Sequence, residues 1–165
     1  MNNIGGLIVT TPTDREIVMT RVFNAPRELV FDAWTKPDLV RRWLLGPPGW
    51  TMPVCEIDLR VGGAYRFEWL SQAGTVMGMG GVYREIVIPE RILNTQLFDQ
   101  DWTGGETLGT LLLTEHAGKT TLTNKVLYSS REARDAALRT RMAEGVEAGY
   151  ARLDEILASN IKEKN

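Results

Sequence analysis

The sequence contains very little of the two side chains that most often build metal sites and nucleophilic centres. It has one cysteine, Cys55, and one histidine, His116, in 165 residues. A single cysteine cannot form an internal disulfide, so a reducing, cytoplasmic location is expected. No His and Cys cluster has the spacing of zinc ligands, and we expect no metal or other cofactor. Cys55 is predicted to be a small buried hydrophobe in a strand, and His116 an exposed residue at a hairpin tip.

Long apolar runs and an excess of charge of one sign are also missing. No uncharged apolar stretch approaches about 18 residues, so no membrane span is expected, and the N-terminus lacks the basic region of a signal peptide. A net charge of −2 and a pI near 5.5 argue against a nucleic-acid partner, which would need clustered positive charge. With 43% apolar residues and no repeat or linker, one globular domain is predicted over residues 1–165, its core at about 15–158.

The periodicity of the apolar residues divides the chain into a sheet and a helix. Period-two alternation, interrupted by glycine-containing turns, predicts strands at 15–23, 52–58, 65–69, 76–88, 92–98, 108–114 and 120–127. Pro26 and Pro37 each begin a short helix, because proline is well placed in a first helical turn. One apolar stripe of helical period then predicts a single long helix over 131–159, carried by Met142, Val146, Gly149, Tyr150, Leu153, Ile156 and Leu157.

These elements predict an α+β helix-grip fold, in which a seven-stranded antiparallel sheet curves around the long C-terminal helix. The glycine-rich string at residues 77–81 lacks the context of a phosphate loop. We expect its glycines to mark a bulge or a bend, where the sheet curves sharply around the helix.

Several motifs resemble those of the activator of heat shock protein 90 ATPase homologue family. They are RVFNAP at 21–26, VFDAW at 30–34, WLLGP at 43–47, DLRVGG at 58–63, GVYREI at 81–86, PERI at 89–92 and TEHAGKT at 114–120. This family belongs to the START-like superfamily, so the resemblance implies a helix-grip fold and a binder of small hydrophobic molecules. One departure is Leu44 after Trp43, where the family often has two adjacent tryptophans.

The aromatic and methionine residues suggest a pocket between sheet and helix. Five tryptophans are more than a core of this size requires, and methionine offers an adjustable apolar surface. The candidate ligand-binding residues are Trp43, Trp50, Tyr65, Phe67, Trp69, Met77, Met79, Phe98, Trp102, Met142, Val146 and Tyr150. Gly145 and Gly149, spaced i and i+4 in the helix, are interpreted as opening space toward the pocket. The alternative is tight packing of Gly149 against the sheet.

These observations favour a binding protein for a small, mostly hydrophobic molecule, without a visible catalytic constellation. Two alternatives stay open. The family resemblance alone implies a co-chaperone-like module that regulates a heat-shock chaperone ATPase, and the same pocket could serve a cyclase- or hydrolase-like enzyme. Glu85 is the one weak catalytic candidate, because period two places it with Met77, Met79 and Tyr83; pairing with a neighbouring arginine is the structural reading. The sequence also leaves a homodimer open.

Overall fold

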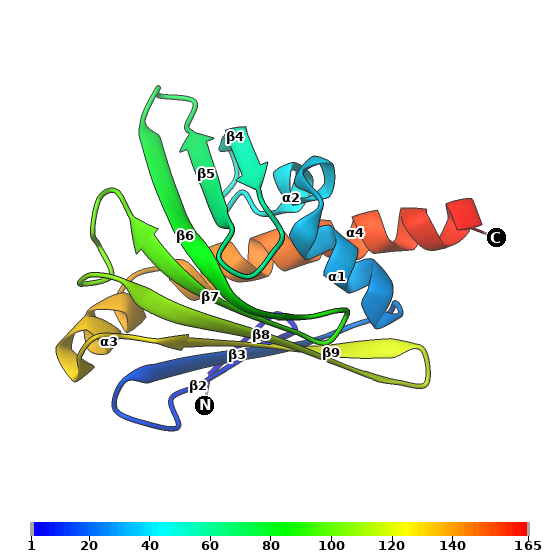
Figure 1. Ribbon diagram of the computed structural model, residues 1–165, viewed down its shortest axis with the longest axis horizontal. Helices are drawn as coiled ribbons and strands as arrows, with labels where there is room; N and C mark the ends of the chain where they lie inside the picture. The colour runs from blue at the N-terminus through cyan, green and yellow to red at the C-terminus, as the bar shows by residue number, and fades with distance from the viewer. Residues whose placement is uncertain (1, 165) are drawn as a thin grey trace.

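A computed structural model describes residues 2–164, which form nine strands and four helices (Figure 1). The strands are β1 (Asn2–Ile4), β2 (Leu7–Thr10), β3 (Glu16–Phe23), β4 (Thr51–Ile57), β5 (Ala64–Leu70), β6 (Val76–Val87), β7 (Arg91–Phe98), β8 (Thr107–His116) and β9 (Lys119–Leu127). The helices are α1 (Arg27–Thr35), α2 (Pro37–Trp43), α3 (Arg131–Leu138) and α4 (Met142–Lys164). Among these helices, none combines the length and the apolar character that a membrane crossing requires.

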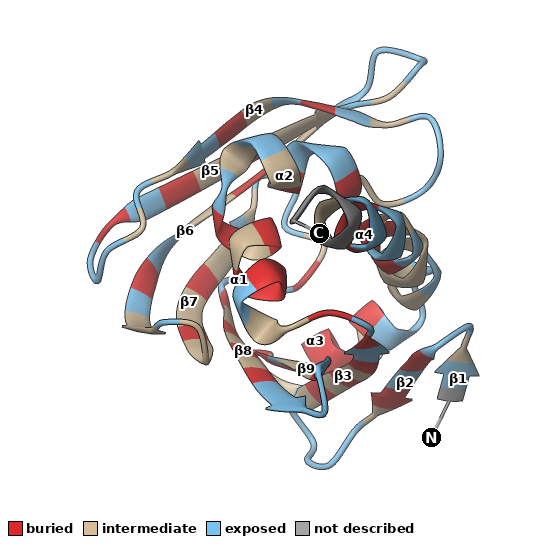
Figure 2. Ribbon diagram, turned by 90° about the vertical axis from the view of Figure 1, so that its right-hand side faces the viewer, coloured by how far each residue is buried: buried red, intermediate tan, exposed pale blue. Residues whose placement is uncertain are grey.

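The strands form one antiparallel sheet in the order β1-β2-β3-β9-β8-β7-β6-β5-β4. Figure 2 shows this sheet end-on as an arc, with α1 and α2 on its concave side and α4 across the opening between the two ends of the arc. The predicted α+β helix grip is therefore confirmed. All seven predicted strands are present as β3 to β9.

The sheet has two strands more than the seven predicted, because β1 and β2 form a hairpin that pairs with β3. Gly5 makes the turn of this hairpin with a positive φ of 58°. Only Leu7 and Val9 carry its buried face, so the alternation spans too few residues to be recognised as a strand in the sequence.

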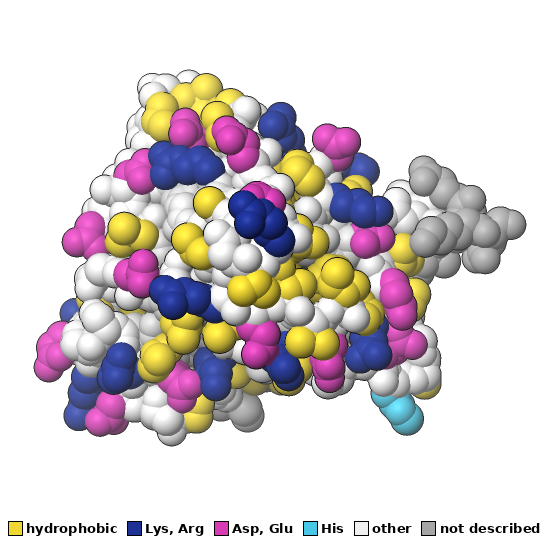
Figure 3. Space-filling view, viewed as in Figure 1, with side chains coloured by type: hydrophobic (Ala, Val, Ile, Leu, Met, Phe, Trp, Pro, Cys, Tyr) yellow, Lys and Arg dark blue, Asp and Glu magenta, His cyan; other side chains and the backbone are white. Residues whose placement is uncertain are grey.

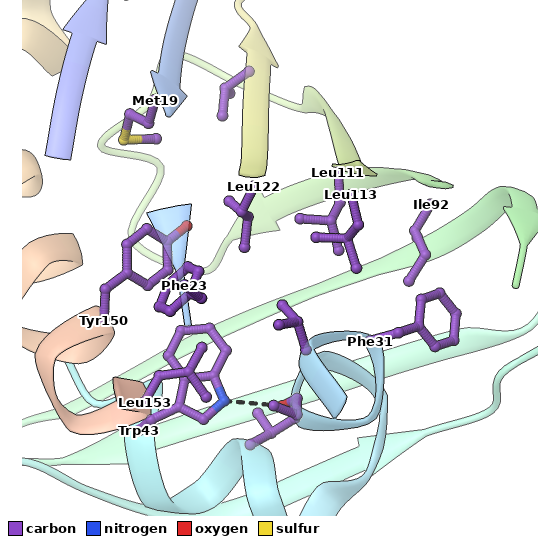
Figure 4. Packing of buried hydrophobic residues seen from close by; sticks show 14 of the residues in the cluster. Met19, Phe23, Phe31, Trp43, Ile92, Leu111, Leu113, Leu122, Tyr150 and Leu153 are labelled. Atoms are coloured by element: carbon purple, nitrogen blue, oxygen red, sulfur yellow. Dashed lines mark hydrogen bonds between the residues drawn. The ribbon is translucent and has the colours of Figure 1, made fainter. Parts of the chain in front are cut away.

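The two short helices form as predicted and are joined by a buried hydrogen bond. Pro37 occupies the first turn of α2, where its missing N–H leaves no partner unsatisfied. The indole N–H of Trp43, at the end of α2, donates to the carbonyl of Ala33 in α1 at 2.9 Å (Figure 4). This bond fixes the angle between the helices and satisfies a polar group that is buried in the core.

The predicted single helix over 131–159 is wrong in one respect: the chain breaks between α3 and α4. The Thr140 hydroxyl donates to the carbonyl of Ala137 at 2.6 Å and accepts from the N–H of Met142 at 3.3 Å. A threonine side chain that bonds to nearby backbone groups competes with the helical ladder. The apolar stripe from Met142 to Leu157 lies entirely on α4, as the helical period predicted.

Helix α4 is fixed to the sheet by a buried arginine on β3. Arg21 is 8% exposed, and its guanidinium donates hydrogen bonds of 2.7 to 3.2 Å to the carboxylates of Glu147 and Asp154 on α4. The same guanidinium lies 4.9 Å from the centre of the Phe23 ring. We call Arg21, Glu147 and Asp154 the Arg21 clamp. It holds α4 across the opening of the sheet with every charged group paired.

A bulge lies just beyond the glycine-rich part of β6 and not within residues 77–81, where it was expected. The register of β6 shifts between Tyr83 and Glu85. Gly81 instead allows a close approach of two strands, because a Cβ at this position would overlap the carbonyl of Thr95 on β7.

Candidate ligand-binding cavity

A cavity of about 640 Å³ lies between the inner face of the sheet and α4. Its walls come from strands β3 and β5 to β9, from α1, α2 and α4, and from the loops that follow α2, β7 and α3. The side chains around it are mostly aromatic or aliphatic. An apolar cavity of this size is typical of a small-molecule site.

The sheet wall consists of a continuous row of aromatic rings. Tyr65 and Phe67 lie 5.2 Å apart, Phe67 and Trp69 6.0 Å, and Trp69 stacks on Phe98 at 6.3 Å. Trp102, from the loop after β7, lies 4.9 Å from Phe98 and extends the row. Met77 and Met79 on β6 complete this wall. The period-two pattern of β5 and β6 places these side chains on one face.

The helical wall contains the remaining residues predicted from the sequence. Met142, Val146 and Tyr150 project from α4, Trp43 comes from the end of α2, and Trp50 from the loop that follows. All twelve candidate residues thus line the cavity. Contact of any of them with a ligand stays a prediction.

Gly149 lines the cavity, but a side chain at this position would not point into open space, contrary to the interpretation from the sequence. A Cβ at Gly149 would lie 2.9 Å from the backbone carbonyl oxygen of Trp43, so the residue allows α4 and α2 to approach closely. At Gly145 the nearest atom to such a Cβ would be Cδ of Pro47, at an ordinary contact distance of 3.6 Å. A glycine in a helix signals a missing side chain, but only the fold shows whether a void or a neighbouring backbone lies there.

Polar side chains in the cavity wall are the main feature that the sequence did not predict. Asn124 on β9 faces inward between the buried Leu122 and Val126, and Asn94 and Gln96 on β7 also line the cavity. The alternation of β9 could have revealed Asn124, since it occupies an inward position of an otherwise apolar face. Trp34 on α1 is a further lining residue, which was not among the candidates chosen from the sequence.

Four tryptophans of the wall form two pairs, which differ in whether the indole N–H has a hydrogen-bond acceptor. The indole N–H groups of Trp43 and Trp69 donate to the backbone carbonyls of Ala33 and Leu44 at 2.9 and 2.7 Å. Those of Trp34 and Trp102 are buried without an acceptor among the residues that the structure describes. A buried donor without an acceptor costs about 1–3 kcal/mol, so such groups are rare and mark a special environment.

The hydroxyl of Tyr150 is the third buried polar group that lacks a partner within residues 2–164. Tyr150 is 1% exposed, and burial raises the pKa of its phenol above the ordinary value. The side-chain amide of Asn124 lies beside the hydroxyl and acts in the opposite direction, lowering this pKa. The phenol therefore stays protonated at neutral pH and keeps a hydrogen available for an acceptor.

The charge of the cavity wall is concentrated at one residue. Among the lining residues that the structure describes, Arg141 is the single charged one. Its side chain is 90% exposed and pairs with Glu144. The other polar lining groups are amides, hydroxyls and indoles, all neutral at pH 7. The interior therefore suits a neutral molecule, since a buried charge needs a partner of opposite sign.

Glu85 lies outside this cavity. The bulge between Tyr83 and Glu85 shifts the register of β6, and the Glu85 carboxylate pairs with Arg91 of β7 on a half-exposed part of the sheet. The bulge thus removes Glu85 from the face that period two assigned to it. The structure supports the alternative in which this carboxylate pairs with a neighbouring arginine.

The two scarce side chains lie where the sequence predicted. Cys55 is buried on β4, where burial raises the pKa of its thiol, and His116 is exposed at the end of β8 (Figure 3). In the described part of the chain, no three His, Cys, Asp or Glu side chains come together in a group that could hold a metal ion.

The curved sheet, the helix across its opening and the cavity between them define a helix-grip protein of the START-like type. Residues 24–158 match the family described as activator of Hsp90 ATPase homolog 1-like protein, and the chain belongs to this family. The resemblance found in the sequence motifs is therefore confirmed.

Solved structures support the same fold. A protein from Rhodobacter sphaeroides is 34% identical, with a TM-score of 0.87 over 93% of this chain and 99% of that chain. Protein CV1439 from Chromobacterium violaceum is 29% identical, with a TM-score of 0.72 over 86% and 96%. Protein Ms6760 from Mycobacterium smegmatis, 23% identical, has a TM-score of 0.82 over 93% and 99% and shows the fold alone. No curated protein matches the sequence.

Proposed function

We propose that the protein binds a small, mostly apolar molecule in the cavity between its curved sheet and α4. The observation that carries this proposal is the cavity itself, about 640 Å³ in volume and bounded mainly by aromatic and aliphatic side chains. Drug-sized ligands bind in pockets of about 300–1,000 Å³ with such walls and a few polar groups.

Packing energetics support the proposal. Protein interiors are close-packed, and an apolar void lowers stability in proportion to its volume. Burial of an apolar ligand yields about 25 cal/mol for each Å² removed from water, so an occupant of the cavity stabilises the folded protein. The aromatic row from Tyr65 to Trp102 supplies flat surfaces for such an occupant.

The proposal is tested with 1-N-phenylnaphthylamine, a neutral apolar fluorophore. We expect saturable binding at one probe per protein, measured by fluorescence titration of the folded protein. Val146→Phe enlarges a side chain that lines the cavity, and it is expected to weaken binding at least about tenfold, which corresponds to about 1.4 kcal/mol.

Val22→Phe is the matched control, because Val22 is 56% exposed on the outer face of β3. This variant should bind the probe like the original protein. Absence of saturable binding, or equal loss of affinity in both variants, would refute the cavity as the binding site.

A further inference from the structure

The sheet wall of the cavity has a polar area where β7 and β8 lie side by side (Figure 1). Asn94 and Gln96 from β7 and Thr107 from β8 line the cavity there. Gly109 of β8 pairs with Asn94 and occupies an inward position, since Thr107 and Leu111, two residues before and after it, also line the cavity. A glycine inside a strand weakens the strand and often marks the close approach of another group.

The groups that approach Gly109 are the side-chain amides of β7. A Cβ at Gly109 would lie 2.5 Å from Nε2 of Gln96 and 3.7 Å from Oδ1 of Asn94. Gly109 does not have a positive φ, so space rather than backbone conformation explains the glycine here. The Gln96 amide therefore occupies the space that a side chain on β8 would fill, and the two amide atoms lie close to one point on the inner face of the sheet.

Hydrogen bonds determine which atom of the Asn94 amide is free. The Tyr65 hydroxyl donates to the carbonyl of Thr95 at 2.6 Å, so it accepts from Nδ2 of Asn94 at 3.0 Å. The same nitrogen donates to the Thr95 carbonyl at 3.2 Å. Both N–H groups of Asn94 are used in this way, and its Oδ1 accepts no hydrogen bond from the residues that the structure describes.

Gln96 complements Asn94, because its free atom is a donor. Its Oε1 accepts from the Thr107 hydroxyl at 3.2 Å, whereas its Nε2 has no acceptor within residues 2–164. In the described part of the chain, the unpartnered side-chain atoms that are sealed from solvent are two indole N–H groups and one phenol. Oδ1 of Asn94 and Nε2 of Gln96 therefore keep accessible surface, and this surface faces the cavity that both residues line.

A free acceptor beside a free donor selects the polar group of a ligand. A carboxylate or a ketone only accepts and would leave Oδ1 of Asn94 unpaired, whereas an ammonium group only donates and would leave Nε2 of Gln96 unpaired. A carboxamide carries its donor and its acceptor on two adjacent atoms, so it can bond to both. It is also neutral, which suits a cavity where Arg141, the single charged lining residue that the structure describes, is exposed.

We propose that the ligand carries a carboxamide, whose N–H donates to Oδ1 of Asn94 and whose oxygen accepts from Nε2 of Gln96. The apolar part of the ligand would lie against the aromatic row, which passes beside this pair, since Phe98 follows Gln96 by two residues on the same face of β7. This assignment rests on the proposed function, because it names the chemical class of the molecule that the cavity binds.

Three 2-substituted naphthalenes of nearly one shape test the assignment: 2-naphthamide, which has the carboxamide, 2-acetonaphthone, which has only the carbonyl, and 2-isopropenylnaphthalene, which has neither. Calorimetric titration is expected to show 2-naphthamide binding about tenfold more tightly than 2-acetonaphthone, because the ketone leaves the Asn94 acceptor unpaired. In Gln96→Met the affinity for 2-naphthamide should fall about tenfold, while the affinity for 2-isopropenylnaphthalene should not fall.

Gly109→Ala tests the arrangement without removing a polar group. The new methyl group would displace the Gln96 amide from its place over β8, so this variant should also lose affinity for 2-naphthamide and keep affinity for 2-isopropenylnaphthalene. A second readout is the infrared band of carbon-13-labelled 2-naphthamide carbonyl, which should lie at a lower frequency in the original protein than in Gln96→Met.

Gln72→Met is the matched control for the loss of a glutamine amide. Gln72 is exposed in the turn after β5 and lies outside the cavity lining. This variant should bind all three compounds like the original protein and leave the carbonyl band of 2-naphthamide unchanged.

The outcomes separate the two proposals. If the compounds bind but neither Gln96→Met nor Gly109→Ala lowers the affinity for 2-naphthamide more than that for 2-isopropenylnaphthalene, the assignment is overturned and the binding function stands. Tighter binding of 2-acetonaphthone than of 2-naphthamide also overturns it. If none of the three binds while 1-N-phenylnaphthylamine does, the assignment alone is overturned. If that probe also fails to bind, the cavity function is refuted as well.

Discussion

Helix α4 carries polar groups on two sides that the fold treats differently. On one side, the carboxylates of Glu147 and Asp154 receive hydrogen bonds of 2.7 to 3.2 Å from Arg21. On the cavity side, the hydroxyl of Tyr150 has no protein partner within residues 2–164, although it lies three residues from Glu147. The carboxylates hold the helix in place, whereas the fold supplies no acceptor for the hydroxyl.

The two sides of α4 differ in the free energy that an unpaired polar group costs there. A buried charge without a partner would destabilise the fold by several kcal/mol, so removal of one member of the Arg21 clamp is expected to be costly. A single neutral hydroxyl or indole costs about 1–3 kcal/mol when left without a partner, which a domain can tolerate.

The largest expected effect is unfolding at alkaline pH, which tests whether the tyrosines on both the sheet and α4 are buried in solution. All four tyrosines of the chain are buried, and burial raises the pKa of each phenol, to about 12 for Tyr128. In the unfolded chain a tyrosine ionises near pH 10. Because the folded pKa is the higher one, the stabilising contribution is complete below about pH 10 and is lost as the pH rises through the folded values.

Tyrosinate absorbance measured against pH provides the check. We expect no ionisation of the folded protein near pH 10, followed by a cooperative rise at higher pH that coincides with loss of the circular dichroism signal. In denaturant, all four tyrosines should ionise near pH 10. A tyrosine that ionises near pH 10 in the folded protein would contradict the buried environment described for these residues.

The second prediction concerns the loss of the ion pairs of the Arg21 clamp. Arg21→Met keeps a long side chain but leaves the carboxylates of Glu147 and Asp154 without a cation, and Glu147 is only 15% exposed. We expect a loss of about 3–5 kcal/mol in the free energy of unfolding, toward the lower value because Asp154 is 46% exposed. Urea denaturation at pH 7 measures this change, and a loss below 1 kcal/mol would show that the clamp is dispensable.

The third prediction compares the two glycines of α4. Gly149→Ala places a Cβ 2.9 Å from the Trp43 carbonyl oxygen, so overpacking should outweigh the gain in helix propensity and cost about 1–3 kcal/mol. Gly145→Ala meets only ordinary contacts and should be neutral or stabilising by up to about 1 kcal/mol. Thermal melts of the two variants provide the measurement. Equal stabilisation in both would restore the interpretation that Gly149 faces empty space.

The smallest change in stability is expected for removal of the Tyr150 hydroxyl. Tyr150→Phe removes a hydroxyl that has no protein partner and keeps the ring packed between Phe23 and Trp43. The free energy of unfolding without ligand should therefore change by less than about 1 kcal/mol, whereas Thr120→Val, which abolishes a buried bond, should cost about 1–2 kcal/mol. A loss in Tyr150→Phe as large as in Thr120→Val would mean that this hydroxyl is already bonded in the folded protein.

Much of the fold could be predicted because its period-two and helical patterns are long and regular. The strands β3 to β9 and the apolar stripe of α4 were predicted in this way. The hairpin of β1 and β2 was missed because only Leu7 and Val9 carry its buried face. The break before Met142 was missed because it depends on how the Thr140 hydroxyl bonds to the backbone.

The candidate site was predictable as an apolar surface but not as a set of hydrogen-bonding groups. Large apolar side chains at inward positions identify a wall directly from sequence. Whether an indole or a hydroxyl has a partner depends on residues far away in the chain, as the bond from Trp43 to Ala33 and its absence at Trp34 demonstrate. Arg21 was missed for a related reason, since a charge at an inward position of β3 is stable only with its partners on α4.

The most direct test of the account is a crystal structure of the protein soaked with 1-N-phenylnaphthylamine. The account predicts the probe inside the cavity, against the aromatic row from Tyr65 to Trp102 and beside Val146. A cavity that contains only ordered water, with no probe, would contradict the central claim that the cavity binds a small apolar molecule.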